Sequence, residues 1–273
     1  MIDPEHFGMK ENGERQMRNF KLILQYEGTR YQGWQRQEST GNTIQGRLEE
    51  LLSRMTGVRT EIQGSGRTDA GVHAYGQCAN FHAQTDLSCG EILAYINRYL
   101  PEDIGVISVE EVPERFHSRL NAVGKTYVYR VLNTEIPHVF DRRYVYAFAQ
   151  PLDVDAMRAA AVYLVGTHDF RAFTSTKKGK KSTVRTIEEI RIDRIGDEIR
   201  FTYSGDGFLY HMVRILTGTL LEAGTGERKP EDMQTILESG NRENAGALAP
   251  AQGLTLWEVR YKDRSFYENQ GKW

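Results

Sequence analysis

Strand patterns and amphipathic helix patterns follow one another along the whole chain, and this order limits the fold more than any other feature. Alternating apolar residues predict strands at 19–28, 59–64, 75–84, 106–112, 125–133 and 254–261. Helical spacing predicts helices at 43–56, 89–99, 153–166 and 207–224, with a short helix from Pro230 to near Gly240. The segment 183–205 is typical of a hairpin that turns at Gly196-Asp197. The succession predicts an α+β fold with mostly antiparallel sheets and helices packed on them.

The length of 273 residues fits one large or two small domains, and 39% hydrophobic residues suffice for a core without disulfide or metal staples. We place the boundary near 113–124 or 134–152. The predicted parts are a variable N-terminal extension (1–17), an N-terminal α+β subdomain (18–123) with a glycine-rich loop, and a C-terminal α+β subdomain (124–273).

Cysteine usage and hydropathy indicate a cytoplasmic protein. Cys78 and Cys89 are the two cysteines, which excludes a disulfide scaffold. No apolar run approaches the roughly 20 residues of a membrane span, and the first 16 residues lack the apolar core of a secretory signal. We therefore expect no membrane association.

Positive charge is concentrated in one segment of a nearly neutral chain. The net charge is −2, so any nucleic-acid surface must arise from local clusters. Within 177–185 the positive residues are Lys177, Lys178, Lys180, Lys181 and Arg185, with no acid among them. This loop is predicted to clamp a nucleic acid, and the alternative is an ordinary solvated loop. If the loop is not the clamp, Arg36, Arg119 and Lys125 are the next candidates.

The sharpest local feature is the glycine-rich stretch 64–73, GSGRTDAGVH. Its three glycines allow tight or left-handed backbone conformations, and between them stand one cation, Arg67, and one carboxylate, Asp69. The spacing fits neither a dinucleotide-binding fingerprint nor a phosphate-binding P-loop. The stretch suits an anionic substrate that needs a carboxylate at its reacting atom. The alternative is a turn with a solvated Arg–Asp pair.

Polar residues also interrupt the apolar pattern of 207–219. Arg214 and Tyr210 are four residues apart, so in a helix they share a face. A buried arginine needs a counter-charge, which Asp69 or a phosphate would supply, although Arg214 could instead extend to solvent. Tyr127 and Tyr129 lie two residues apart and share a strand face. As a pair they are typical of a core, although one of them could instead stack on an unpaired base.

Metal binding is not expected. His73, Cys78 and His82 fall within ten residues but match no zinc spacing, and no fourth ligand accompanies them.

Four motifs together resemble one family. GSGRTDAGVHA (64–74), FH-x-R-x-x-A-x-x-K-x-Y-x-Y (116–129), G-x-HDF-x-x-F (166–173) and GFLYHMVRILTG (207–218) are similar, in order and spacing, to those of the TruA family of tRNA pseudouridine synthases. The opening Y-x-GT-x-Y-x-GWQRQ (26–37) and the closing GL-x-L-x-x-V-x-Y (253–261) agree as well. The resemblance covers residues 18 to 262.

The resemblance implies an isomerase that converts uridine to pseudouridine in the anticodon stem-loop, at tRNA positions 38, 39 and 40. It implies a homodimer, no cofactor and no metal, and the pseudouridine synthase fold, in which two subdomains surround a central cleft. Carried over by motif, Asp69 is the catalytic aspartate, Tyr127 packs on the target base, and Arg67 and Arg214 are arginines of the cleft. Three roles remain open for Asp69: attack on C1′, attack on C6, or removal of a proton from C2′.

Two other classes of function remain to be weighed. A non-enzymatic RNA-binding module has no need of a carboxylate among cations, because it repels phosphate. A nucleoside or glycoside hydrolase usually needs two carboxylates. Asp69 would be one, and the nearest candidates for the second are Glu27 and Asp169, neither of which lies in a comparable motif.

Overall fold

The computed structural model describes residues 16–136, 138–176 and 182–262. Almost all of the predicted N-terminal extension, and Lys177, Lys178, Lys180 and Lys181 of the predicted clamp, lie outside these ranges. The described chain has an α+β fold, as predicted. Its helices are α1 (Ile44–Thr56), α2 (Cys89–Tyr99), α3 (Val154–Val162), α4 (Met212–Gly224) and α5 (Asp232–Ser239). Its strands are β1 (Arg18–Tyr26), β2 (Ile62–Gly64), β3 (His73–Ala83), β4 (Ile104–Val112), β5 (Ala122–Leu132), β6 (Tyr146–Ala147), β7 (Gly166–Asp169), β8 (Val184–Ile195), β9 (Glu198–Gly205) and β10 (Leu254–Tyr261).

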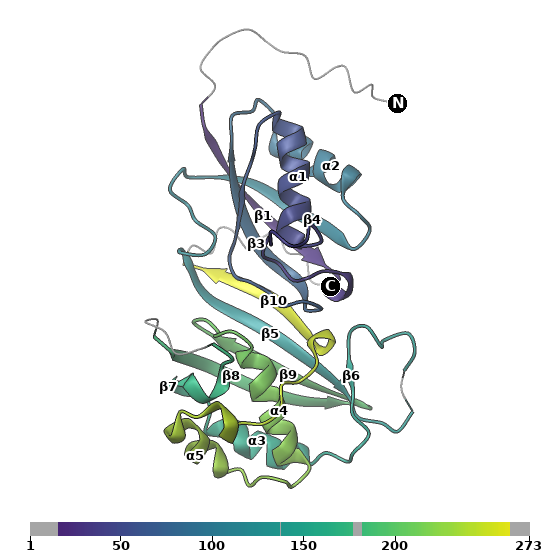
Figure 1. The fold of residues 1–273 in the computed structure, drawn as a ribbon, viewed down its shortest axis with the longest axis vertical. Coiled ribbons are helices and arrows are strands. Elements are labelled where there is room, and N and C mark those ends of the chain that lie inside the picture. The colour runs from purple at the N-terminus through teal and green to yellow at the C-terminus, as the bar shows by residue number, and fades with distance from the viewer. Residues whose placement is uncertain (1–15, 137, 177–181, 263–273) are drawn as a thin grey trace.

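One sheet runs through the whole described chain (Figure 1). Its order is β4-β1-β3-β10-β5-β9-β8-β7, with β2 paired to β3 and β6 paired to β5. The pairs β3–β10 and β5–β6 are parallel, and the other described pairs are antiparallel, which confirms the predicted preference. The last strand, β10, lies between β3 and β5 and so joins the two halves of the chain. The division into two subdomains stays a prediction, since the sheet continues across residues 123 and 124.

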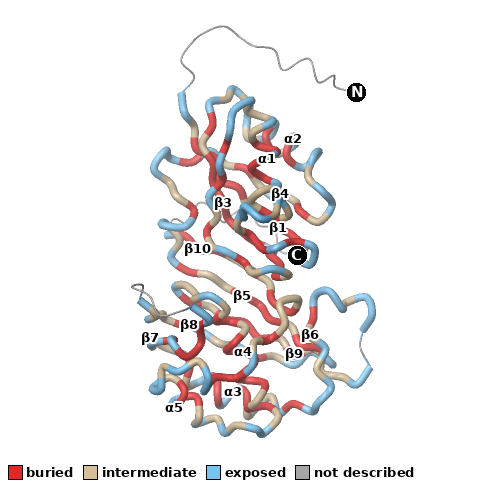
Figure 2. Tube along the Cα trace, in the orientation of Figure 1, coloured by how far each residue is buried: buried red, intermediate tan, exposed pale blue. Residues whose placement is uncertain are grey.

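Each half of the sheet has its own helices (Figure 1). α1 and α2 lie with the N-terminal strands, and α3, α4 and α5 lie with the C-terminal strands. Local sequence sets several helix ends: Ser88 and Glu91 form a reciprocal capping box at the start of α2, and Gly57 and Gly240 end α1 and α5 in the left-handed conformation. Buried residues follow the sheet and the helix faces that turn toward it (Figure 2).

The start of α4 corrects one prediction. The helix begins at Met212 and not at Gly207, because His211 takes a left-handed conformation (φ 65°) and residues 207–211 are not helical. Tyr210 therefore lies outside the helix and does not share a helical face with Arg214. Contacts from a distant segment hold this turn: Ser175 N–H and the Thr174 hydroxyl both donate to the Tyr210 carbonyl. The helix predicted within 153–166, with Asp153 near its start and Gly166 after its end, has Asp153 as its N-cap and ends at Val162.

Candidate active site

A row of paired residues crosses the middle of the sheet on the face that carries α4. Cross-strand pairing puts these side chains on one face: Tyr26 opposite Ala74, Leu256 opposite Ala74 and Tyr127, and Tyr127 opposite Tyr203. The Tyr203 hydroxyl is hydrogen-bonded to Thr217 of α4 (2.8 Å), and the Tyr26 hydroxyl to Thr68 of the glycine-rich loop (2.8 Å). The row thus contacts both the glycine-rich loop, through Thr68, and helix α4, through Thr217.

The glycine-rich loop connects β2 to β3 and rests on residues 28–34. Trp34 N–H donates to the Thr68 carbonyl (3.0 Å), and Gly71 N–H donates to the Tyr31 carbonyl (3.4 Å). Gly33 has φ +86°, and a Cβ there would lie 2.5 Å from the Thr68 carbonyl oxygen and 3.0 Å from the carbonyl carbon of Asp69. The backbone on either side of Asp69 is therefore held at a distance that only glycine permits.

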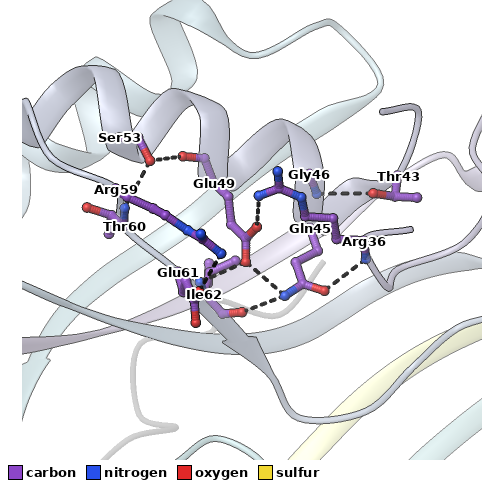
Figure 3. A network of polar contacts seen from close by, with 10 residues as sticks. All are labelled: Arg36, Thr43, Gln45, Gly46, Glu49, Ser53, Arg59, Thr60, Glu61 and Ile62. Atoms are coloured by element: carbon purple, nitrogen blue, oxygen red, sulfur yellow. Dashed lines mark hydrogen bonds and ion pairs between the residues drawn. The ribbon is translucent and has the colours of Figure 1, made fainter. Parts of the chain in front are cut away.

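A polar network behind this support ties it to α1 (Figure 3). The guanidinium of Arg36 pairs with the buried Glu49 carboxylate (3.0 Å), which also accepts from Gln45 (2.9 Å) and from the Ile62 amide (3.3 Å). Gln45 in turn accepts from the Arg36 amide (2.9 Å). Arg36, a fallback candidate for RNA binding, therefore has a carboxylate partner, and the network fixes the 33–37 segment beneath the loop.

Asp69 meets Arg214 from the other half of the chain. Arg214 Nη1 lies 3.1 Å from Asp69 Oδ2, and the two residues are 145 positions apart in sequence. Arg214 Nε also donates to the Ala249 carbonyl (2.7 Å), so the guanidinium is held at two points. The expected counter-charge of this arginine is Asp69, and the pair fixes the orientation of the carboxylate.

His211 is a further neighbour of Asp69. Its Nε2 lies 3.5 Å from Asp69 Oδ2, and its Nδ1 lies 2.9 Å from the Ser175 hydroxyl. Burial lowers the pKa of His211, and the positive charge of Arg214 lowers it further, although the Asp69 carboxylate acts in the opposite direction. His211 is the one non-glycine residue with positive φ in the described chain. Such strain is common at functional sites.

Tyr127 lies within this group. It is buried, its ring meets Phe208 edge-on (5.3 Å between centroids), and burial raises the pKa of its hydroxyl, with smaller contributions from Tyr26 and Asp69. Its hydroxyl forms no hydrogen bond to any residue that the structure describes. Within the described chain, the position of Tyr127 is therefore set by the packing of its ring and not by a hydrogen bond to its hydroxyl.

Arg67 and the basic loop stand apart from the Asp69 ion pair. Arg67 is exposed and donates from Nε to the side chain of Gln35 (2.9 Å). Of the five predicted clamp residues only Arg185 lies in the described ranges; it is half-buried near the start of β8. The alternative of a solvated Arg67–Asp69 pair does not fit, because Asp69 pairs with Arg214 instead.

The two candidate second carboxylates have other partners. Glu27 caps the turn at Thr29 and pairs with Arg143 (3.4 Å), and Asp169 pairs with Arg171 (3.1 Å). Across the described ranges no three His, Cys, Asp or Glu side chains gather as metal ligands, and no helix there is long and apolar enough to span a membrane. The site offers one carboxylate with a guanidinium and an imidazole.

Sequence reasoning missed two neighbours of this loop. The sequence gives no signal for the role of His211, because a left-handed residue at a helix start leaves no periodic pattern. Lys125 was named only as a fallback, yet its Nζ donates to the Ser65 carbonyl (2.9 Å) inside the loop. The lysine lies two residues before Tyr127, and that spacing on a strand was the available signal.

Comparisons with known proteins agree with these motifs. A family model described as tRNA pseudouridine synthase matches residues 22–121 and 160–262. A tRNA pseudouridine synthase A from Bacillus sp. (strain KSM-64) is 50% identical over 245 residues, covering 90% of this chain and 100% of the relative. A tRNA pseudouridine synthase A 2 from Clostridium perfringens is 46% identical over 245 residues, with the same coverage of both chains.

Proposed function

The chain belongs to the tRNA pseudouridine synthase family, and from that premise we propose that it isomerises uridine to pseudouridine in the anticodon stem-loop of tRNA, at positions 38, 39 and 40. The observation that carries this proposal is the single carboxylate of Asp69, held by Arg214 over the middle of the sheet. One oriented carboxylate is the minimum that the reaction requires.

The chemistry needs no net oxidation and no transferred group. The C1′–N1 glycosidic bond breaks, the uracil turns, C5 bonds to C1′, and the proton lost from C5 is balanced by one gained at N1. Asp69 supplies a nucleophile at C1′ or C6, or a base at C2′. Because the target uridine is stacked in the stem-loop, it must first flip out.

Tyr127 and the arginines take supporting roles in this proposal. The Tyr127 ring packs on the flipped uracil and limits its rotation, as aromatic rings do with unstacked bases. Arg214 positions Asp69 by their ion pair. Arg67, exposed on the same loop, contacts the RNA beside the vacated stack.

The finer statements on assembly are also proposals. We infer a cytoplasmic homodimer, with the substrate cleft between two subdomains, one contributing Asp69 and the other Arg214. The apolar side chains of Ile136, Val139 and Phe140, the last 97% exposed, support a protein contact in the connection between β5 and β6.

The decisive test is Asp69→Asn. The amide is nearly isosteric but is a poor nucleophile and base, so pseudouridine formation in a tRNA transcript should fall at least a thousandfold, while tRNA affinity is kept. Asp155→Asn, on the exposed face of α3, is the matched control and should retain full activity. Turnover of Asp69→Asn within tenfold of wild type would contradict the assignment. Release of free uracil would identify a hydrolase instead.

A further inference from the structure

Lys125 covers the start of the catalytic loop. Besides the bond from its Nζ to the Ser65 carbonyl, its Nζ lies 2.5 Å from the place where a Cβ on Gly66 would stand. Gly66 therefore leaves the room that the ammonium group occupies. Lys125 and Tyr127 point to the same face of β5, about 7 Å apart along the strand.

Two arginines lie on the same side of the sheet as Lys125. Gly205 pairs with both Lys125 and Ile187, so Arg185, two residues before Ile187, shares the face of Lys125. Arg119 follows Ser118, whose hydroxyl donates to the Gln63 carbonyl just before the loop. Burial lowers the pKa of Lys125, and the charges of both arginines lower it further, to about 8. Three cations from three segments thus converge beside the loop.

No carboxylate of the described chain pairs with any of these three cations. Arg185 donates to the carbonyls of Ser182 (3.1 Å) and Val184 (2.6 Å), and neither acceptor carries a formal charge. Lys21, with 2% of its side chain exposed, differs from the half-buried Lys125 because it pairs with a carboxylate, that of Glu110, at 3.0 Å. Because uncompensated cations repel one another and disfavour burial, the cluster is built for an anion that comes from outside.

We propose that Lys125, together with Arg119 and Arg185, binds a backbone phosphate of the RNA next to the flipped nucleotide. This rests on the proposed function, which supplies RNA as the anion. Ser65 takes one of the three ammonium donors, and the other two are available for phosphate oxygens. A single phosphate on Lys125 couples substrate binding to the loop that carries Asp69.

Lys125→Met tests the site, because it keeps the length of the side chain and removes the charge. Binding of a tRNA transcript is measured from low to moderate salt. We expect roughly tenfold weaker binding at low salt, and a slope of log affinity against log salt that is smaller by about 0.7–0.9. Lys125→Arg should restore the slope. Lys229→Met, an exposed lysine before α5, is the control and should match wild type.

Arg119→Gln and Arg185→Gln keep the proposal testable if Lys125→Met does not fold. Neither arginine side chain is hydrogen-bonded to the described loop residues 64–73, and each substitution should also lower the slope. A purely structural role for Lys125 predicts lower stability or kcat with an unchanged slope. Wild-type slopes in the soluble variants would overturn the phosphate site. If the slopes fall but wild-type enzyme forms no pseudouridine, the phosphate site stands and the proposed function fails.

Discussion

Tyr127 and Tyr129 occupy the same face of β5, but the fold uses their hydroxyl groups differently. Tyr129 donates to the Pro250 carbonyl (2.7 Å), whereas the Tyr127 hydroxyl has no hydrogen-bond partner among the described residues. Both rings are buried. The contrast separates a tyrosine whose hydroxyl ties two segments together from one that the described chain holds by its ring, which packs edge-on against Phe208.

Tyr127→Phe should therefore retain kcat/KM within about threefold, because removing an unpaired hydroxyl is nearly neutral. Tyr127→Ala should lower kcat/KM more, since a base–aromatic contact is worth about 1–3 kcal/mol. Steady-state pseudouridine assays compare the two, with urea unfolding as a check on folding.

Tyr129→Phe is the matched control for the first change. It should cost about 1 kcal/mol of unfolding free energy, because it leaves the Pro250 carbonyl unpaired. If Tyr127→Phe proves as inactive as Tyr127→Ala, the hydroxyl carries the function and the stacking role is wrong.

At the scale of elements, the segment between β1 and α1 acts as a support for the loop between β2 and β3. Trp34 and Tyr31 bind the loop backbone, and the Arg36–Glu49 pair anchors the segment to α1. The close approach at Gly33 joins the two elements. This contact, and not the loop sequence alone, sets the position of Asp69.

Gly33→Ala should displace the loop. The substitution combines a positive φ with a Cβ at 2.5 Å from the Thr68 carbonyl oxygen, so it should cost more than the roughly 1 kcal/mol expected from φ alone and should lower kcat at least tenfold.

Gly57→Ala is the control for backbone strain. Gly57 also has a positive φ (+75°), but nothing lies within 4 Å of its Cβ position. It should lose stability only and keep kcat. Equal effects of the two substitutions on kcat would contradict the role assigned to the close approach.

At the scale of the whole molecule, His73 joins segments from the two halves of the chain. Its Nδ1 accepts from the Gly28 amide (3.0 Å), so its Nε2 carries the proton and donates to the carbonyls of Arg143 (2.9 Å) and Gln252 (3.1 Å). Burial lowers the pKa of His73 below its usual 6.5. Protonation of Nδ1 would break the hydrogen bond from the Gly28 amide, because two N–H donors would then face each other.

Stability should therefore depend on pH in a defined direction. The native state prefers neutral His73, so its contribution is complete above pH 6.5 and is lost as the pH falls from there toward the lowered native pKa. The loss is at most about 1.4 kcal/mol per pH unit for one group. His73→Gln, which offers one acceptor and one donor, should show a shallower loss between pH 7 and 5 in urea unfolding. The remaining dependence includes His211, whose pKa is also lowered. An unchanged pH dependence in His73→Gln would rule out this linkage.

Local patterns determined much of the fold. The helix predicted at 89–99 and the strand predicted at 254–261 have the same bounds in the structure, because a capping box and a regular apolar period act within a few residues. The glycine-rich loop around Asp69 was visible in the sequence for the same reason. The need of Arg214 for a counter-charge was also visible, from its apolar surroundings.

Only the tertiary structure decided how these parts meet. The place of β10 between β3 and β5, the left-handed start of α4 at His211, and the contact of Lys125 with the Ser65 carbonyl all depend on residues far apart in the chain. Sequence periodicity reports which face of an element is buried, but it holds no information on which distant element covers that face. The sequence thus determined the candidate catalytic groups and their local supports, and long-range packing placed Arg214 Nη1 3.1 Å from Asp69 Oδ2.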